Sequence, residues 1–203
     1  MTPIERYVNT VNMSDVRDRL VQCARDLFLE TGYNGFSMRK VAACAGVSAT
    51  AIYRHFSDRE DLLVEVVMRG YRVFTAQLKN ASRGQSPLEH LEQLALSYVE
   101  FALSERSYYE FMFMTTGELT GLRHIPEDGR RETQQALKIV EDALASCIRE
   151  HSVRATDATS AALELWAFCH GLISLYFTCK IDATESQFRK TYAAMLHDYV
   201  SRI

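Results

Sequence analysis

The chain has 203 residues, 47% of them hydrophobic, and a formal net charge of −3. This length can bury one sizeable core, or a small domain attached to a larger one, and the slightly acidic balance disfavours a protein that binds nucleic acid through its overall charge. Only 9 glycines and 3 prolines are present, which favours an all-α protein with short connections.

Export and membrane signals are not expected in this sequence. Residues 1–12 are polar and lack the apolar run of a signal peptide. The longest apolar run, residues 165–179, is interrupted by His170 and Gly171 and is shorter than a membrane span. We therefore expect a cytoplasmic protein with no membrane partner, whose five cysteines are reduced, mostly buried thiols: Cys23, Cys44, Cys147, Cys169 and Cys179.

Patterns typical of enzymes are missing from the sequence. None of the six histidines lies three to five residues from another, so a helix-borne zinc or di-iron site is not expected. The chain also has no glycine-rich phosphate loop and no Gly-x-Ser-x-Gly elbow. We expect no catalytic residues, no metal site and no cofactor.

The first predicted elements, in residues 36–63, are two short helices joined by a turn. Ser37 can cap the first helix, and Gly46 permits the left-handed turn that ends it. Ser48 can cap the second helix, residues 49–55, whose inner side carries Ile52 and Phe56. This order of parts favours a helix-turn-helix, which inserts its second helix into the major groove of DNA, although two packed helices that touch nothing would have the same pattern.

A long helix follows this motif, and basic residues lie within the motif and at the start of the long helix. Ser57 and Glu60 fit a capping box at the start of the long helix. Between residues 39 and 59, four basic residues face one acidic residue, Asp58, so the local charge is +3. The rest of the chain is slightly acidic, which should keep non-specific DNA binding weak and place specific binding on this patch.

Residues 20–63 closely resemble the N-terminal domain of TetR-family transcriptional regulators. The matching residues form a long ordered series: Ala24-x-x-Leu27-Phe28, Gly32-Tyr33, Phe36-Ser37-Met38-Arg39, Val41-Ala42, Ala45-Gly46-Val47-Ser48, Ile52-Tyr53-Arg54-His55-Phe56 and Arg59-Glu60-x-Leu62. Many members have Gly-Thr where this chain has Thr50-Ala51, so no operator sequence carries over. The resemblance implies a DNA-binding domain over residues 14–60 and a ligand-binding and dimerisation domain over residues 61–203.

Roles for individual residues follow from this resemblance and from the helix faces. Family positions that hydrogen-bond phosphates are matched by Ser37, Tyr53, His55 and Arg59. Outward-facing residues that can reach base edges include two arginines able to bind guanine and a threonine able to touch a thymine methyl group. The alternatives are that Tyr53 is a packing residue and that Arg54 is a solvated charge. The predicted DNA-binding residues are Ser37, Arg39, Ser48, Ala49, Thr50, Tyr53, Arg54, His55 and Arg59.

The remainder of the chain is predicted to be a helical bundle. Ser86 and Pro87 mark one helix start, and further helices are expected over residues 126–151, 157–180 and 186–202. The last two carry more apolar side chains than one face can bury, which indicates pairing with a second copy of the chain. A monomer that buries both helices is the alternative. The predicted dimer interface comprises Leu165, Phe168, Leu172, Leu175, Tyr192, Met195 and Tyr199.

The bundle also carries aromatic and methionine side chains suited to an apolar small molecule. Trp166, His170 and Gly171 match the Trp-x-x-x-His-Gly signature of one branch of the TetR family, which names no effector. Aromatic stripes at helical spacing are core more often than pocket, and that remains the alternative here. The predicted ligand-binding residues are Tyr98, Phe101, Tyr109, Met112, Phe113, Trp166, His170 and Tyr176.

These observations predict a regulator of transcription, with repression as the family default. It would bind a palindromic operator in double-stranded DNA as a homodimer and be released by a small, mostly apolar effector. Two alternatives stay open: a thiol-based redox-sensing regulator, and a DNA-binding protein without ligand input. The sequence names neither the effector nor the operator.

Overall fold

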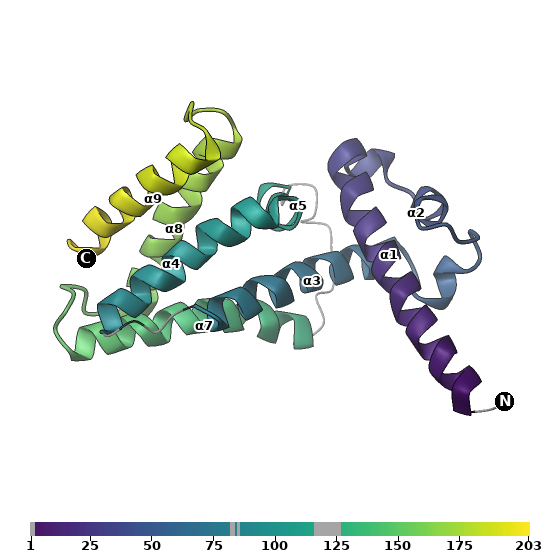
Figure 1. Ribbon diagram of the computed structural model, residues 1–203, viewed down its shortest axis with the longest axis horizontal. Helices are drawn as coiled ribbons and strands as arrows, with labels where there is room; N and C mark the ends of the chain where they lie inside the picture. Colours follow the sequence, from purple (N-terminus) through teal and green to yellow (C-terminus); the bar gives the residue numbers. More distant parts are fainter. Residues whose placement is uncertain (1–2, 82–83, 85, 116–126) are drawn as a thin grey trace. The chain divides into compact units, whose positions relative to one another are not determined.

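The computed structural model describes residues 3–81, 84, 86–115 and 127–203. Every regular element within these ranges is a helix, which confirms the all-α fold (Figure 1). Contacts divide the chain into two compact units. The N-terminal unit holds the described residues of Met1–Gly70 and Ser107–Ile125, and the bundle unit holds those of Tyr71–Arg106 and Pro126–Ile203.

The N-terminal unit is built around helix α1 (Pro3–Gly35), which packs against the short helix α2 (Met38–Cys44). Near its end, α1 is interrupted at Gly32, whose φ of 64° lies in the region that favours glycine. The unit is completed by the first part of α3 (Arg59–Lys79) and by the π-helix η2 (Glu110–Met114). Its largest fully buried side chains come from several elements of the unit: Tyr109, Leu20, Phe28, Ile52, Phe56, Leu62, Leu63 and Phe111.

Helix α2 begins and ends as the sequence predicts. The Ser37 side chain accepts a hydrogen bond from the Lys40 amide at 3.2 Å, and its backbone is extended, as at an N-cap. Gly46 has a φ of 69°, and the Val47 amide donates back to the Ala42 carbonyl at 2.9 Å. These bonds satisfy carbonyl groups that the end of a helix would otherwise leave unpaired.

The second helix of the motif is shorter and tighter than predicted. In place of an α-helix over residues 49–55, the structure has a single 3₁₀ turn, η1 (Ile52–Arg54). Ser48 still accepts from the Ala51 amide at 3.1 Å, but the Arg54 and His55 amides bond three residues back rather than four. Seven residues are too few to sustain an α-helix by local bonding, so tertiary packing decides the geometry.

The cap of α3 is displaced by one residue from the predicted Ser57–Glu60 box. The Asp58 carboxylate accepts from the Asp61 amide at 2.9 Å, and the Asp61 carboxylate accepts from the Ser57 amide at 2.8 Å. Asp58 is therefore the N-cap, because an ionised carboxylate is a stronger acceptor than a hydroxyl beside the positive end of the helix.

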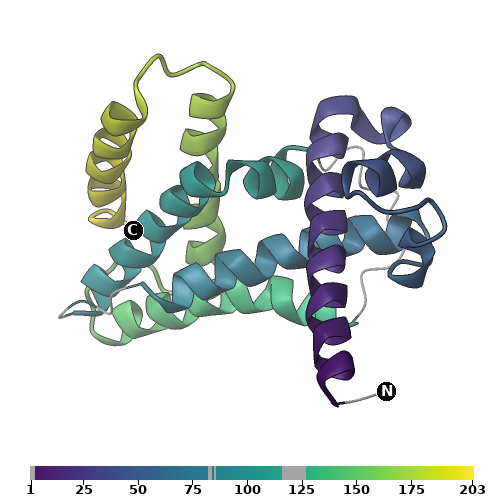
Figure 2. The ribbon, with the colours of Figure 1, turned by 45° about the vertical axis from the view of Figure 1, so that its right-hand side comes forward.

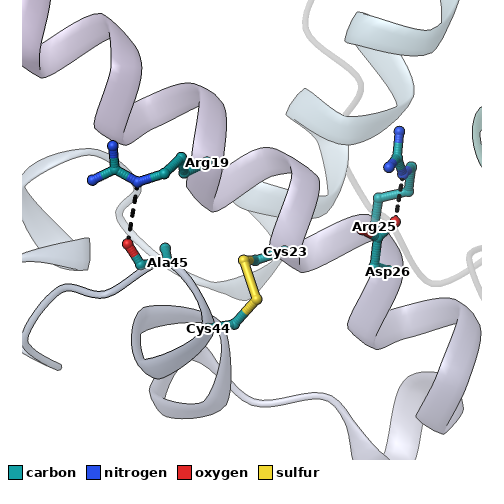
Figure 3. The surroundings of a disulfide bond; sticks show 6 residues. All are labelled: Arg19, Cys23, Arg25, Asp26, Cys44 and Ala45. Atoms are coloured by element: carbon teal, nitrogen blue, oxygen red, sulfur yellow. Dashed lines mark hydrogen bonds and ion pairs between the residues drawn. A yellow bond between two sulfur atoms is a disulfide. The ribbon is translucent and has the colours of Figure 1, made fainter.

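The cysteine prediction is wrong for two of the five residues. Cys23 on α1 and Cys44, the last residue of α2, form a disulfide with their Cα atoms 5.9 Å apart (Figure 3). Cys44 is exposed rather than buried. Closing a loop of this size stabilises a fold by about 3 kcal/mol in the chain-entropy description. Of the free cysteines, Cys147 and Cys169 are buried as predicted, whereas Cys179 is exposed.

The bundle unit consists of the remainder of α3 together with α4 (Pro87–Ser104), α7 (Glu127–Arg149), α8 (Ala158–Phe177) and α9 (Glu185–Val200). Helix α4 packs against α7, α8 and α9, and α7 packs against α8 (Figure 2). The predicted cap at Ser86 is confirmed, with the Glu89 amide donating to it at 3.2 Å. Asp157 and Thr184 cap α8 and α9 in the same way.

Helix α8 lies within the predicted range of residues 157–180 and has 20 residues. It contains an 18-residue window with a mean hydropathy of 1.2, so it is long and apolar enough to cross a membrane by length and composition alone. The core helix of a bundle has the same character, and α8 buries Leu165, Cys169 and Ile173 against its neighbours.

The cap assignment at α3 can be tested by two alanine substitutions. Asp58→Ala should lower the free energy of unfolding by about 1 kcal/mol, because the first turn of α3 loses its acceptor. Ser57→Ala should cost less than half of that, since its backbone amide keeps the bond to Asp61. Thermal or urea unfolding measures both variants, and the reverse order would restore Ser57 as the cap.

Candidate nucleic-acid interface

The residues predicted to meet base edges lie on the surface of the N-terminal unit. Arg39 projects from the first turn of α2 and Arg54 from η1, and Thr50 lies in the turn between them; all three are exposed. Among the described residues, neither arginine has an acidic or hydrogen-bonding partner. An unpaired guanidinium presents its full set of donors to an incoming acceptor, such as O6 and N7 of guanine.

The other predicted contacts fall into two groups. Ser48 and Ala49 are exposed, and Tyr53 is 57% exposed, which argues against a packing role for its ring. Ser37 and His55 are half-buried, and the Ser37 hydroxyl already accepts a bond from the Lys40 amide. We call residues 48–56 the reading segment, because they carry most of the exposed predicted contacts.

Arg59 differs from the other predicted contacts because it is engaged inside the unit. Its guanidinium lies 3.5 Å from the centre of the Tyr33 ring and donates a hydrogen bond to the Tyr33 carbonyl. It also lies 5.5 Å from the Phe36 ring. Arg59 therefore ties the first turn of α3 to the end of α1, and its contact with phosphate remains a prediction.

Two further arginines on α1 support the reading segment and the turn that precedes it. Arg19 donates from Nε to the Ala45 carbonyl at 3.3 Å, next to the disulfide (Figure 3). Arg17 lies 4.7 Å from the Phe56 ring centre and pairs with Glu65 of α3 at 3.0 Å. Neither contact has a local sequence signal, since the partners lie 26 to 48 residues away in the chain.

Five of the eight predicted ligand-binding residues belong to the bundle unit. Trp166 donates from its indole nitrogen to the Tyr98 hydroxyl at 3.1 Å, and that hydroxyl lies 3.2 Å from Nδ1 of His170. Phe74 of α3, which the sequence analysis did not assign, lies 4.9 Å from Phe101 and 5.3 Å from Tyr98 between ring centres. These side chains form an aromatic cluster with a polar centre. Trp166 is 42% exposed, so solvent reaches the edge of the cluster.

The remaining ligand candidates are placed elsewhere. Tyr176 stacks on Phe188 of α9 at 4.1 Å. Tyr109, Met112 and Phe113 belong to the N-terminal unit, where Tyr109 is fully buried and lies 5.2 Å from Phe113 between ring centres. A hollow of about 500 Å³ on α7 contains none of the eight candidates and is lined by Arg131, Gln134, Gln135, Leu137, Lys138 and Glu141.

The predicted dimer residues divide between the core and the surface of the bundle unit. Leu165, Leu172 and Tyr192 are buried within the unit, and the Tyr192 hydroxyl donates to the Ala95 carbonyl at 3.0 Å. The accessible residues are Phe168, which stacks on Tyr199 at 4.3 Å, and Leu175 and Met195, which are exposed. Leu163, 56% exposed on α8, is a further apolar surface residue that the periodicity did not pick out.

The His170 ring predicts a pH dependence of stability. Burial lowers the pKa of His170, so its neutral form is favoured in the folded protein. The unfolded chain then binds a proton first as the pH falls, and stability is lost below the ordinary pKa of about 6.5. His170→Gln should flatten the fall in unfolding free energy between about pH 7 and pH 5. Identical pH profiles for the two proteins would contradict this.

Comparison with known proteins identifies the relatives of this chain. The family described as "Bacterial regulatory proteins, tetR family" matches residues 20–66, and "Tetracyclin repressor-like, C-terminal domain" matches residues 91–199. An HTH-type transcriptional regulator of Staphylococcus aureus (strain USA300) is 30% identical over 83 residues, which are 41% of this chain. The match spans 45% of the length of that curated relative, so its likeness concerns less than half of each protein.

Two solved structures show the same fold over most of the chain. The fatty acid degradation regulator FadR from Bacillus halodurans superposes with a TM-score of 0.73 at 17% identity, covering 89% of this chain and 93% of that one. The TetR-family regulator PfmR from Thermus thermophilus gives a TM-score of 0.72 at 17% identity, with coverage of 91% and 98%.

Proteins of this family regulate transcription by binding DNA and are in general not enzymes, and membership implies a soluble cytoplasmic protein. The match to the C-terminal domain alone covers more than half of the chain, and the helix-turn-helix match precedes it in the same order as the structural units. The chain therefore belongs to the TetR family of DNA-binding transcriptional regulators.

Proposed function

We propose that this chain is a repressor that binds a palindromic operator as a homodimer and is released by a small, mostly apolar ligand. The observation that carries the DNA-binding part is the exposure of Arg39 and Arg54, for which the described residues provide no acidic or hydrogen-bonding partner. The exposed Thr50 and Tyr53 lie close to Arg54 in the chain. Base-edge readout needs such side chains, because each bidentate arginine–guanine pair discriminates against the wrong base. Ser37, Tyr53 and His55 would fix the register by binding phosphates.

A homodimer would supply the second copy of this surface. The exposed residues Leu163, Leu175 and Met195 on α8 and α9 leave apolar area that a partner copy can cover. A Cβ added at Gly171 on α8 would meet no atom within 4 Å, so a second helix could approach closely there. A two-fold axis between such copies implies a palindrome whose half-sites are about one helical turn, or ~34–36 Å, apart or a multiple of it.

Ligand release would begin at the aromatic cluster of the bundle unit. Phe74, Phe101 and Trp166 offer apolar surface, and the Tyr98–His170 pair offers one polar contact. Phe74 belongs to α3, the helix whose first turn Arg59 ties to the end of α1. A ligand that prefers the arrangement unable to bind DNA would shift α3 and change the spacing of the two reading segments.

Fatty acids are a reasonable first class of test compound, because FadR from Bacillus halodurans, a fatty acid degradation regulator, has the same fold. The compound should bind the protein, as measured by calorimetry, and weaken its binding to DNA. A compound that saturates the protein and leaves DNA affinity unchanged would contradict this coupling.

The DNA-binding proposal is tested by mixing the protein with fragmented DNA from its source genome and sequencing the retained fragments. We expect a discrete palindrome. Arg54→Ala should weaken binding to that palindrome by roughly tenfold to a hundredfold and bring specific and non-specific affinities closer together. Arg202→Ala, which removes an exposed arginine of the bundle unit, should change neither affinity. Equal weakening of Arg54→Ala on all sequences would show that Arg54 binds only phosphate.

Substitution of two leucines of similar exposure, one inside and one outside the proposed interface, tests the dimer proposal. Leu175 on α8 is 46% exposed and Leu137 on α7 is 38% exposed. Leu175→Glu should raise the dimer dissociation constant by at least about tenfold, because it places a charge in an apolar interface. Leu137→Glu should leave the dimer intact. Sedimentation velocity over a concentration series measures both, and a dilute-solution monomer for the unmodified protein would remove the dimer from the proposal.

A further inference from the structure

We infer that Cys23 and Cys44 are a site of reversible oxidation, at which a hydroperoxide closes a disulfide that locks α2 to α1 and strengthens operator binding. The effect on DNA rests on the proposed function, whereas the oxidation itself does not. The inference starts from the disulfide, which joins two helices of the N-terminal unit across 21 residues of sequence.

The two cysteines are already placed for this bond by the packing of the unit. Their Cα atoms are 5.9 Å apart, within the range that a disulfide spans without moving the backbone. The residue that follows each cysteine is held by its own contacts. Ala24 and Ala45 are buried, and Arg19 donates a hydrogen bond to the Ala45 carbonyl. The helices would therefore keep the pair close when the bond is open.

The compartment in which such a protein works makes the bond conditional. A DNA-binding regulator of this family is cytoplasmic, and glutathione and thioredoxin keep cytoplasmic thiols reduced. Disulfides that do form there are usually transient and report on redox state. The pair is thus expected to be two thiols at rest, and the bond to appear when oxidant exceeds the reducing capacity of the cell.

Exposure and charge favour Cys44 as the first thiol to react. Cys44 is exposed and Cys23 is half-buried, so peroxide meets the Cys44 sulfur first. The guanidinium of Arg19 binds the carbonyl of Ala45, the residue that follows Cys44 (Figure 3). The other end of this guanidinium is paired with Asp15. A cation near a thiol stabilises the thiolate, which is the nucleophile.

The chemistry balances with a hydroperoxide as the two-electron oxidant. The Cys44 thiolate attacks one peroxide oxygen, so that a sulfur–oxygen bond forms, the oxygen–oxygen bond breaks and hydroxide leaves. The Cys23 thiol then attacks the sulfenic acid, the sulfur–sulfur bond forms and water leaves. With hydrogen peroxide, two thiols lose two electrons and two protons, and two water molecules are produced. A cellular dithiol reverses the step by thiol–disulfide exchange.

The position of the bond explains why it should affect DNA binding. Cys44 is the last residue of α2, two residues before Gly46 and four before Ser48, where the reading segment begins. With the bond closed, Arg39, Thr50 and Arg54 are still exposed, so the closed form retains the surface that reads DNA. Fixing a binding surface in its competent arrangement lowers the conformational cost of binding.

The test compares reduced protein with protein treated with hydrogen peroxide. Peptide mapping without reductant should show Cys23 joined to Cys44 only after treatment. Hydrogen exchange of α2 and the reading segment should slow, and affinity for the palindrome recovered from genomic DNA should rise by about fivefold. Reductant should reverse all three changes.

Three serine variants make the assignment specific. Cys23→Ser and Cys44→Ser should lose all three responses, whereas Cys179→Ser, which removes an exposed free cysteine of the bundle unit, should respond like the unmodified protein. Thiols that stay free under peroxide, or a closed bond that leaves exchange and affinity unchanged or lowers affinity, would overturn the inference. If the reduced protein binds no DNA, the proposed function fails instead, and mapping and exchange still decide whether the bond closes and locks α2.

Discussion

The reading segment cannot hold its own shape, and the rest of the DNA-binding surface depends on how α1 supports it. Its only regular element is the three-residue turn η1, far below the length at which local hydrogen bonds sustain a helix. Ile52 and Phe56 bury almost completely, and Arg17 and Arg19 of α1 hold Phe56 and Ala45. Exposed side chains such as Thr50 and Arg54 therefore take their positions from α1, not from the segment that carries them.

Much of this arrangement could be predicted from the sequence, because its signals are local. The Ser37 cap, the Gly46 turn and the Ser86 cap each depend on residues within four or five positions of one another, and all three are confirmed. Apolar periodicity likewise identified Ile52 and Phe56 correctly as buried side chains. The family resemblance then supplied the DNA-binding role, which local signals alone left open.

The errors share a different physical origin: each involves a choice between neighbouring residues or partners distant in sequence. Ser57 and Asp58 can both cap a helix, and the Asp58 carboxylate is the group that caps α3, because a negative charge is favoured at the positive end of the helix dipole. Nothing local places Cys23 beside Cys44, or turns Arg59 back onto Tyr33. Periodicity on α8 could not distinguish side chains buried within the unit from those left on its surface, since both repeat every three to four residues.

The route by which a ligand could act on the reading segment is set by the chain connections between the two units. Helix α3 passes from the N-terminal unit to the bundle unit after Gly70, and α5 (Arg106–Tyr109) passes back after Arg106. Within the N-terminal unit α3 lies close to α5 and to η2, which follows α5, because a Cβ added at Gly70 would collide with the side chains of Met112 and Tyr108.

A continuous helix such as α3 transmits a displacement better than a flexible linker, because it moves as a packed body. A shift of the bundle end of α3 would thus reach Arg59 and Tyr33, and through them the C-terminal end of α1, the helix that supports the reading segment. Ligand binding and the redox state of Cys23 and Cys44 would then both act on α1. Ligand binding would act at Tyr33, and the disulfide would act at Cys23. On the proposed mechanism, each input changes how firmly α1 holds the DNA-binding surface.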